Sequence, residues 1–323
     1  MAGSTANVPA SCGTGGGRIM SEGPDFLCIG LLEAGTTWLY DQLRNHDAFW
    51  MPPLKELHFL DGEYPSKGLQ AKVKRFGIAP EGTYDARDAA FFAQVQEHPD
   101  PTADLDFYAS LFAPKAGLLS GDITPRYGAL AEEQIAAIAA HFPRLRIAVM
   151  VRDPVARLWA QTARAASAIE HHKARLTDVA AYAPWATGPI FAPFSYPSQM
   201  VERWRRHFPK DQLHVFFYED LLSRPEWLRD KIIRFIGGTK AVPGARLPAT
   251  YASNDPAPPE PAHRDALVSS LGEEVVAAAK LFGEHAKSWP ALYGLATPPR
   301  GKAAGTKAVT KPKTTRSRKK LAG

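Results

Sequence analysis

Apolar residues along the chain follow two periodicities, which together predict alternating strands and helices. Three short, continuous apolar runs predict buried strands, at residues 26–30, 146–151 and 213–218. The run at 146–151 is the clearest, because such continuity is typical of a parallel sheet that is covered on both faces. Segments with apolar side chains on one helical face predict helices. These are residues 36–45, 134–141, 157–169, 199–207, 226–236 and 262–282.

Strands that alternate with helices along the chain indicate an α/β protein. We expect a three-layer, P-loop-like fold, with a central parallel sheet flanked by helices. The 323 residues are enough for one large domain with a sizeable core, and no internal repeat is found. Amino-acid composition predicts where the folded domain begins and ends. Residues 1–23 are predicted to be a disordered leader, residues 24–298 the domain, and residues 299–323 a disordered basic tail.

The net charge of +6 arises from this tail and not from a basic face on the domain. Residues 300–323 hold nine Lys or Arg side chains and no acid, while the whole chain has 39 basic and 33 acidic residues. Without the tail the balance would therefore be slightly negative. A solvated extension is the favoured interpretation. Contact with nucleic acid or an anionic surface is the alternative, and only through the tail.

The sequence also limits the cellular setting. No run approaches the ~20 apolar residues that span a bilayer, and the N-terminus lacks the apolar core of a secretory signal. The two cysteines, Cys12 and Cys28, make neither a disulfide framework nor a metal site. We therefore expect a cytoplasmic protein with no membrane span and no metal. No pattern indicates its oligomeric state.

A turn between the first strand and the first helix has the composition of an anion site. Gly30 and Gly35 bracket four residues, and Thr36 and Thr37 follow. Such a turn points backbone N–H groups and a helix N-terminus at one spot, where a negative charge is favoured. A nucleoside triphosphatase would carry Lys-Ser or Lys-Thr at this point. Because that lysine is missing, ATP hydrolysis and kinase chemistry are disfavoured.

The amino-acid sequence around this turn resembles that of a known family. Residues 24–39, which contain Ala-Gly-Thr-Thr-Trp-Leu, are similar to the 5′-phosphosulfate loop of PAPS-dependent sulfotransferases. Residues 151–157, Val-Arg-Asp-Pro-Val-Ala-Arg, resemble the family's 3′-phosphate motif. Residues 52–59 resemble the stretch after the first helix in its bacterial and heparan-type members. Further matches in the family's order are residues 121–127 and 212–221.

The resemblance implies the sulfotransferase fold, with PAPS as the sulfate donor and PAP as the product. It assigns donor binding to Ala34, Gly35, Thr36, Thr37, Trp38 and Arg152. Amides and hydroxyls of the loop would hold the 5′-phosphosulfate. The planar guanidinium of Arg152 would grip the 3′-phosphate, at an edge of the sheet where ligands collect. A surface ion pair with Asp153 is the alternative role of Arg152, and a plain core position that of Trp38.

Sulfuryl transfer needs a base for the acceptor proton and positive charge near the bridging oxygen. Glu56 matches the glutamate that serves as base in heparan-type members, and Lys55 precedes it. His58 is the alternative base, since an unperturbed histidine titrates near pH ~6.5. In an extended segment Glu56 and His58 would share a face. From the residues alone, an exposed Lys55–Glu56 pair and a structural His58 stay open.

Two positions depart from the family pattern. Glu33 stands where the loop lysine is expected, and one like-charge contact at ~4 Å costs about 4 kcal/mol at an effective dielectric of ~20. Ala160 replaces the usual serine, a lost hydrogen bond of about 1–3 kcal/mol. Lys55 could replace the missing cation with Glu33 turned to solvent, or the donor or acceptor could differ. The third explanation is a catalytically degenerate member that acts as a non-catalytic binding protein.

The acceptor is a hydroxyl or amine that the sequence does not identify, on a carbohydrate, a lipid or another small molecule. The protein is therefore expected to have a small molecule or a glycan as its partner. Residues 62–106, 182–196 and 246–261 are the expected acceptor walls. Their aromatic side chains suit sugar or aryl groups, or form local core. They are Tyr64, Tyr84, Phe91, Phe92, Trp185, Phe191 and Phe194.

Overall fold

A computed structural model of the chain describes residues 23–62, 85–97, 104–239 and 255–295. The predicted basic tail at 299–323 lies outside these residues, as does the predicted leader except for Gly23. Part of the expected acceptor walls lies outside them too, including Tyr64 and Tyr84.

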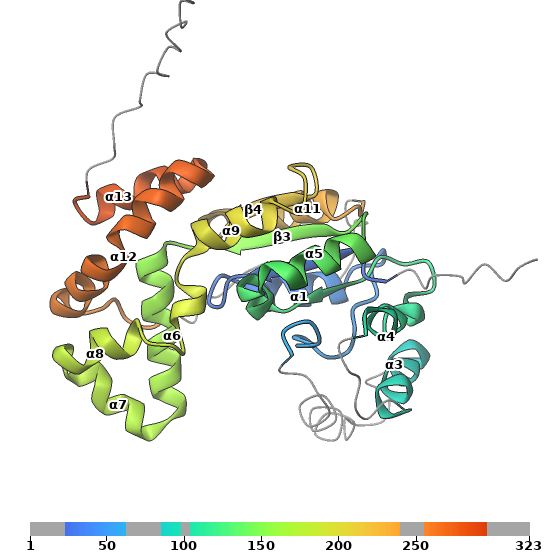
Figure 1. Cartoon of the computed structure of the whole chain (residues 1–323), viewed down its shortest axis with the longest axis horizontal. Helices are drawn as coiled ribbons and strands as arrows, with labels where there is room; N and C mark the ends of the chain where they lie inside the picture. The colour runs from blue at the N-terminus through green and yellow to red at the C-terminus, as the bar shows by residue number, and fades with distance from the viewer. Residues whose placement is uncertain (1–22, 63–84, 98–103, 240–254, 296–323) are drawn as a thin grey trace, which may run out of the picture.

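The centre of the fold is a four-stranded parallel sheet in the order β2-β1-β3-β4 (Figure 1). Phe26 pairs with Gly121 on one side and Arg146 on the other, and Ile147 pairs with Leu213. Three strands confirm the predicted runs, and β3 has the predicted bounds. The strands are β1 (Phe26–Gly30), β2 (Gly121–Ile123), β3 (Arg146–Val151) and β4 (Leu213–Phe217).

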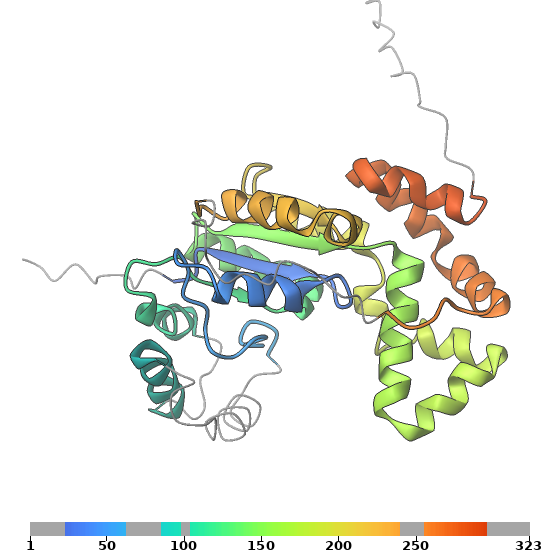
Figure 2. The ribbon, with the colours of Figure 1, turned by 180° about the vertical axis from the view of Figure 1, so that it is seen from behind.

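Helices cover both faces of the sheet, as the two opposite views in Figures 1 and 2 show. On one face lie α1 (Thr36–Arg44) and α11 (Pro225–Phe235). On the other lie α5 (Glu132–His141) and α9 (Pro197–Arg205). Their apolar stripes face the strands, and burying one such side chain stabilises by about 1.5–3 kcal/mol. The predicted three-layer α/β architecture is therefore confirmed.

A group of helices gathers on the side toward which the strands point (Figure 1). It consists of α6 (Pro154–Ala168), α7 (Glu170–Thr177), α8 (Val179–Ala186), α12 (Pro261–Phe282) and α13 (Trp289–Leu292). The sequence placed the start of α6 at residue 157, whereas it begins at Pro154. Asp153 accepts from the Ala156 amide at 2.8 Å as an N-cap, and proline suits the first helical position.

Several short elements were not predicted. Strand β2 has three residues with Asp122 at its centre, so no apolar run marks it. Residues 182–196, which the sequence predicted to be a loop that lines the acceptor site, begin instead in a helix, because α8 extends to Ala186 from an N-cap at Asp178. The other unpredicted helices are α3 (Ala86–Glu97), α4 (Leu105–Ser110), α7, α10 (Tyr218–Ser223) and α13. Short 3-10 turns at 113–115, 125–129, 192–194 and 284–288 complete the described chain.

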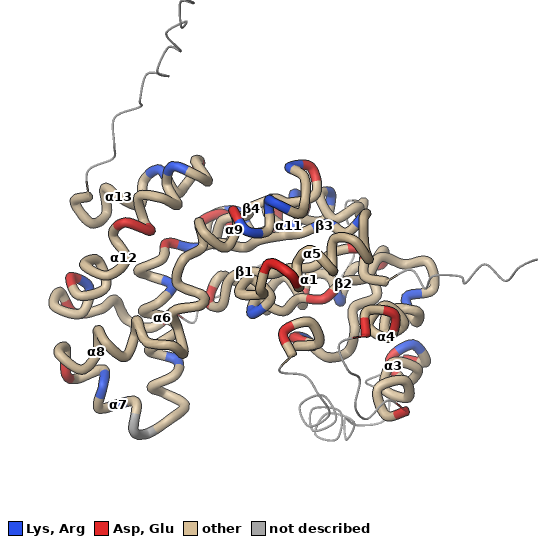
Figure 3. The backbone as a smooth tube through the Cα atoms, in the orientation of Figure 1, with Lys and Arg blue, Asp and Glu red and all other residues tan. Residues whose placement is uncertain are grey.

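Acidic and basic residues are interspersed over the described part of the chain (Figure 3). This agrees with the expectation that the domain carries no basic face. Within the same residues, no helix is long and apolar enough to cross a membrane, and no cluster of His, Cys, Asp or Glu side chains could hold a metal ion.

Candidate functional site

The predicted site residues converge on the carboxyl edge of the sheet, where the ends of the parallel strands meet. The loop Leu31–Gly35 follows β1, and Arg152 follows β3. The segment that contains Lys55, Glu56 and His58 is held at the end of β2, since the Leu57 amide lies 3.5 Å from Asp122 Oδ1. Segments far apart in the sequence therefore form one edge, as open α/β sheets commonly do at their ligand sites.

The loop after β1 leaves the start of α1 open. Gly35 is the N-cap with φ 91°, no side chain caps the helix, and no acid lies in its first turn. A Cβ at Gly35 would collide with the Leu221 side chain, so both backbone and space require glycine. The Ala34 amide donates to Leu31 O at 3.2 Å. Among the described residues, no hydrogen-bond acceptor is found for the amides of Gly35, Thr36 and Thr37.

The side chains of the loop differ in accessibility. Thr37 is exposed, while Thr36 is buried. Trp38 is 6% exposed and belongs to the hydrophobic core. That is the core position which the sequence left open for it. The anion-binding potential of the loop thus rests on three amides, one exposed hydroxyl and the positive end of α1.

Arg152 is held by a carboxylate from a distant part of the chain. Its Nη1 and Nη2 donate to Asp255 Oδ1 and Oδ2 at 2.8 and 3.0 Å, and Nη1 also donates to Glu33 O at 3.1 Å. The guanidinium lies 4.4 Å from the ring centroid of Tyr218, whose hydroxyl donates to Asp255 at 3.1 Å. Asp153 caps α6 instead, so the ion pair of Arg152 is with Asp255.

Glu33 is also paired. Arg164 of α6 donates from Nε and Nη2 to its two carboxylate oxygens at 2.6 and 2.9 Å. The Glu33 side chain is 14% exposed and that of Arg164 61%. Glu33 is therefore not turned to solvent, and the ammonium of Lys55 pairs with Glu56. Arg164 was missed, although it stands seven residues after Arg157 on the same helical face.

Arg157 is fully buried with neutral partners. Its Nη1 donates to Gln161 Oε1 at 2.6 Å and its Nη2 to Ser195 Oγ at 3.2 Å. Burial lowers the pKa of Arg157 to about 10, opposed by the charge of Glu33. The side chain thus stays cationic at neutral pH. Ala160, which departs from the family pattern, is buried on the same helix.

The predicted acid–base residues form one charged cluster. Lys55 pairs with Glu56, and His58 Nε2 lies 3.6 Å from Glu56 Oε2. On its other side, His58 Nδ1 lies 2.7 Å from Asp61 Oδ2. The expectation of an extended segment is wrong, because Glu56 and His58 have φ of 62° and 58°. Left-handed backbone of this kind costs about 1–2 kcal/mol per residue and is often found at functional sites.

Asp61 is a second group that the sequence did not single out, although it stands three residues after His58. A carboxylate on one ring nitrogen orients the imidazole and fixes its tautomer. The carboxylate of Glu56 is the more strongly perturbed group. Burial raises its pKa, but hydrogen bonding to His58 and the charge of Lys55 outweigh that effect and lower it to about 2. Glu56 is therefore ionised at neutral pH and is a weak base by itself.

A buried network at the end of β2 fixes this cluster in place. Asp122 is 2% exposed and accepts from Tyr127 at 2.7 Å and from Tyr108 at 3.1 Å. The Tyr127 hydroxyl also accepts from the Phe59 amide at 2.9 Å. Burial raises the pKa of Asp122. The residues of this network form the rigid support on which the strained Glu56–His58 segment rests.

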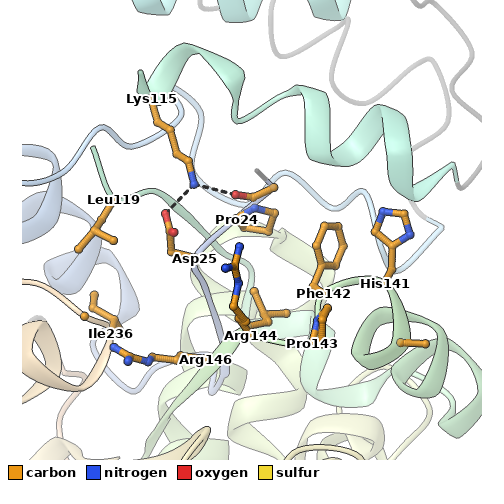
Figure 4. Close-up of a pocket in the computed structure, with 14 residues that line it drawn as sticks. Pro24, Asp25, Lys115, Leu119, His141, Phe142, Pro143, Arg144, Arg146 and Ile236 are labelled. Atoms are coloured by element: carbon orange, nitrogen blue, oxygen red, sulfur yellow. Dashed lines mark hydrogen bonds and ion pairs between the residues drawn. The ribbon is translucent and has the colours of Figure 1, made fainter. Parts of the chain in front are cut away.

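The cavity in Figure 4 lies at the opposite, amino-terminal edge of the sheet, with a volume of about 700 Å³. Asp25 and Arg146, at the starts of β1 and β3, contribute to its wall. Lys115 points into it, and its Nζ donates to Asp25 at 2.9 Å and to Gly23 O at 3.0 Å. This cation is therefore paired within the chain, and the cavity is separate from the carboxyl-edge site.

Comparisons with known proteins place this edge of the sheet in a known fold. A sulfotransferase crystal structure from Alicyclobacillus acidocaldarius matches with a TM-score of 0.56 and 20% identity, over 82% of this chain and 98% of that one. The sulfotransferase domain of the Synechococcus olefin synthase matches with a TM-score of 0.45 and 20% identity, over 69% of this chain and 76% of that one. At 20% identity, the likeness to the Alicyclobacillus structure concerns the fold alone. No curated protein sequence matches the chain.

The sequence profile of the Sulfotransferase family matches residues 24–240, which is most of the chain. The match contains the loop after β1, the Lys55–Asp61 cluster and the Arg152–Arg164 stretch. The open helix start, the arginines beside it and the charged cluster at the end of β2 thus lie within a recognised family framework, and the chain belongs to the sulfotransferase family.

Proposed function

We propose that the protein transfers a sulfuryl group from PAPS to a hydroxyl or amine of an acceptor. The observation that carries this proposal is the pairing of Arg152 with both oxygens of Asp255 beside the open start of α1. A guanidinium in this geometry grips a phosphate as well as a carboxylate. PAPS carries a 3′-phosphate and a 5′-phosphosulfate, and it supplies the electrophilic sulfur.

The loop and its arginines fit such a donor. The amides of Gly35, Thr36 and Thr37 and the N-terminus of α1 suit the 5′-phosphosulfate. Arg152 suits the 3′-phosphate, with Tyr218 beneath its guanidinium. In this arrangement the Asp255 carboxylate stands where a donor oxyanion would pair with Arg152. We therefore expect the donor to displace Asp255 on binding.

The charged cluster at the end of β2 suits proton removal from the acceptor. In the proposed reaction, the acceptor proton passes to the Glu56–His58 pair, and Asp61 holds the imidazole in place. Lys55 supplies positive charge on the same side.

Titration of PAP by calorimetry tests the donor site. We expect the unmodified protein to bind PAP, and Arg152→Met to weaken binding by about 100-fold, since a charge-assisted pair is lost. Asp255→Asn should tighten binding by about tenfold, because the competing carboxylate is gone. Asp265→Asn, in an exposed pair with Arg264, is the matched control and should leave binding unchanged.

Absence of PAP binding at millimolar concentration, in both the unmodified protein and Asp255→Asn, would contradict the proposal. Transfer of sulfate from PAPS to any acceptor by the unmodified protein would exclude a non-catalytic binding protein on the same fold. If PAP binds but a broad panel of hydroxyl and amine acceptors is never sulfated, the binding-protein alternative is the better account.

A further inference from the structure

A second cavity lies directly beside the charged cluster. Its volume is about 480 Å³, within the usual range for small-molecule sites. Its wall has an apolar part formed by Leu130, Pro189, Ile190, Pro193 and Phe194. Ile190 is 62% exposed, so the apolar part of the wall is accessible from solvent.

Three polar residues line the same cavity, and they have different roles. The Gln134 amide is engaged, because it donates to Leu60 O at 3.2 Å and accepts from the Ala131 amide at 3.0 Å. Asp61 holds His58. Arg126 is the cation among the described lining residues, and its side chain is 35% exposed with the guanidinium 5.2 Å from the Phe194 ring centroid.

Arg126 and His58 both lie close to the same carboxylate oxygen of Asp61. Asp61 Oδ2 lies 2.7 Å from His58 Nδ1 and 3.8 Å from Arg126 Nε. The two nitrogens therefore cannot be farther apart than these two distances together. A ligand that places its reacting hydroxyl at the Glu56–His58 pair consequently has the Arg126 guanidinium only a few bonds away.

We propose that the sulfate acceptor is a small hydroxy acid with an apolar body, whose carboxylate is recognised by Arg126. A guanidinium that lies over an aromatic ring binds a carboxylate with defined geometry. The apolar wall takes the body of the acceptor, and the hydroxyl faces the base. This inference rests on the proposed sulfotransferase function and names the acceptor class of that same site.

The proposed step balances in atoms and charge. The bond from sulfur to the bridging phosphate oxygen breaks, and a bond forms from sulfur to the acceptor oxygen. The electron pair of the broken bond stays on the phosphate, which gives PAP. The acceptor hydroxyl proton goes to the Glu56–His58 pair, and the product is a sulfate ester that keeps its carboxylate on Arg126.

Matched acids and amides test the inference in the protein saturated with PAP, which cannot react. Suitable probes are mandelate, 3-phenyllactate and 4-(hydroxymethyl)benzoate, each compared with its primary amide by calorimetry. Mandelate and 3-phenyllactate carry the hydroxyl on the carbon next to the carboxylate and differ in the length of the link to the ring, while 4-(hydroxymethyl)benzoate separates hydroxyl and carboxylate across the ring. For at least one pair we expect the acid to bind about tenfold or more tightly than the amide.

Variants identify the side chain responsible. Arg126→Met should abolish the preference for the acid while leaving amide binding within about twofold, and Arg126→Lys should keep part of it. Arg144→Met, at the exposed edge of the far cavity in Figure 4, removes the same charge elsewhere and should change nothing. PAP binding, measured in the same cell beforehand, shows that each variant is folded.

The outcomes separate the two proposals. If PAP does not bind to the unmodified protein, the donor function fails, and the acceptor inference fails with it. If PAP binds but no acid of the panel binds, or acid and amide bind equally, only the acceptor inference is overturned. It is also overturned if the preference for the acid survives in Arg126→Met.

Discussion

At the residue scale, Glu33 sets the charge balance beside the loop. Family members usually have a lysine at this position. In this chain, the Glu33 carboxylate forms an ion pair with Arg164, which lies 131 residues away in the sequence. Because Arg164 is mostly exposed, this pair stabilises the fold by only about 0–1 kcal/mol. Its main effect is to neutralise a guanidinium that would otherwise attract the donor.

We therefore predict that Glu33→Gln tightens PAP binding by about three- to tenfold, because one negative charge beside a polyanion is removed and Arg164 is released. Arg164→Met should weaken it by a similar factor. In a double-mutant cycle, the double variant should bind PAP with about the affinity of the unmodified protein. Calorimetry at two salt concentrations checks this, and an unchanged affinity in Glu33→Gln would contradict it.

The pKa of Glu56 leads to a second prediction. With a folded pKa of about 2 and an ordinary value of 4.5, Glu56 is ionised throughout the neutral range. Its contribution to stability is fully present above pH 4.5 and is lost as the pH falls toward 2. Any loss of kcat between about pH 5 and 8 should therefore not arise from Glu56.

The pH profile of sulfate transfer tests this assignment. Any acid limb above pH 5 should persist in Glu56→Gln at a lower kcat. Disappearance of that limb in Glu56→Gln would contradict the assignment. Circular dichroism can follow unfolding in acid. Between pH 4.5 and 2, the stability of Glu56→Gln should depend less on pH than that of the unmodified protein, whereas Glu133→Gln, a helix-surface control, should behave like the unmodified protein.

At the element scale, the joint between β1 and α1 depends on Gly35. Gly35 has φ 91° and packs against Leu221 of α10, so an added Cβ meets both backbone strain and a side chain. Gly117 offers a matched control, since it has φ 86° but nothing within 4 Å of an added Cβ. The two positions separate backbone strain from collision at the loop.

We predict that Gly117→Ala destabilises the protein by about 1–2 kcal/mol, through strain alone, and leaves PAP binding unchanged. Gly35→Ala should lower the free energy of unfolding further and abolish PAP binding, because the loop amides are displaced. Thermal unfolding and calorimetry on both variants check this. Equal effects of the two substitutions would show that the contact with Leu221 has no role.

At the scale of the whole molecule, charge divides between the domain and residues 300–323. Deleting these residues removes nine cations and no acid, so the net charge changes sign. If the tail associates with nucleic acid, binding by the full chain should weaken steeply with salt and vanish on truncation after Pro299. Fluorescence anisotropy with labelled DNA measures both, while PAP binding should not change. Salt-insensitive binding, or binding that survives truncation, would contradict this role.

The sequence by itself determined the layers of the fold. A short continuous apolar run such as 146–151 is typical of a strand that is buried on both faces of a parallel sheet. The amphipathic segments between such runs bury their apolar faces by covering the sheet. The loop at Gly35, the position of Arg152 and the Lys55–His58 segment were also readable, because they are local motifs. Strand β2 was not, because the burial of Asp122 depends on Tyr108 and Tyr127, which no local pattern links to it.

Only the tertiary structure decided the pairing of charges at the site. Arg152 meets Asp255 across 103 residues, and Glu33 meets Arg164 because β1 and α6 converge at the carboxyl edge of the sheet. Local sequence specifies helices, strands and turns through backbone preferences and apolar periodicity. Electrostatic partners, in contrast, are set by distances in space, which depend on how all the layers pack.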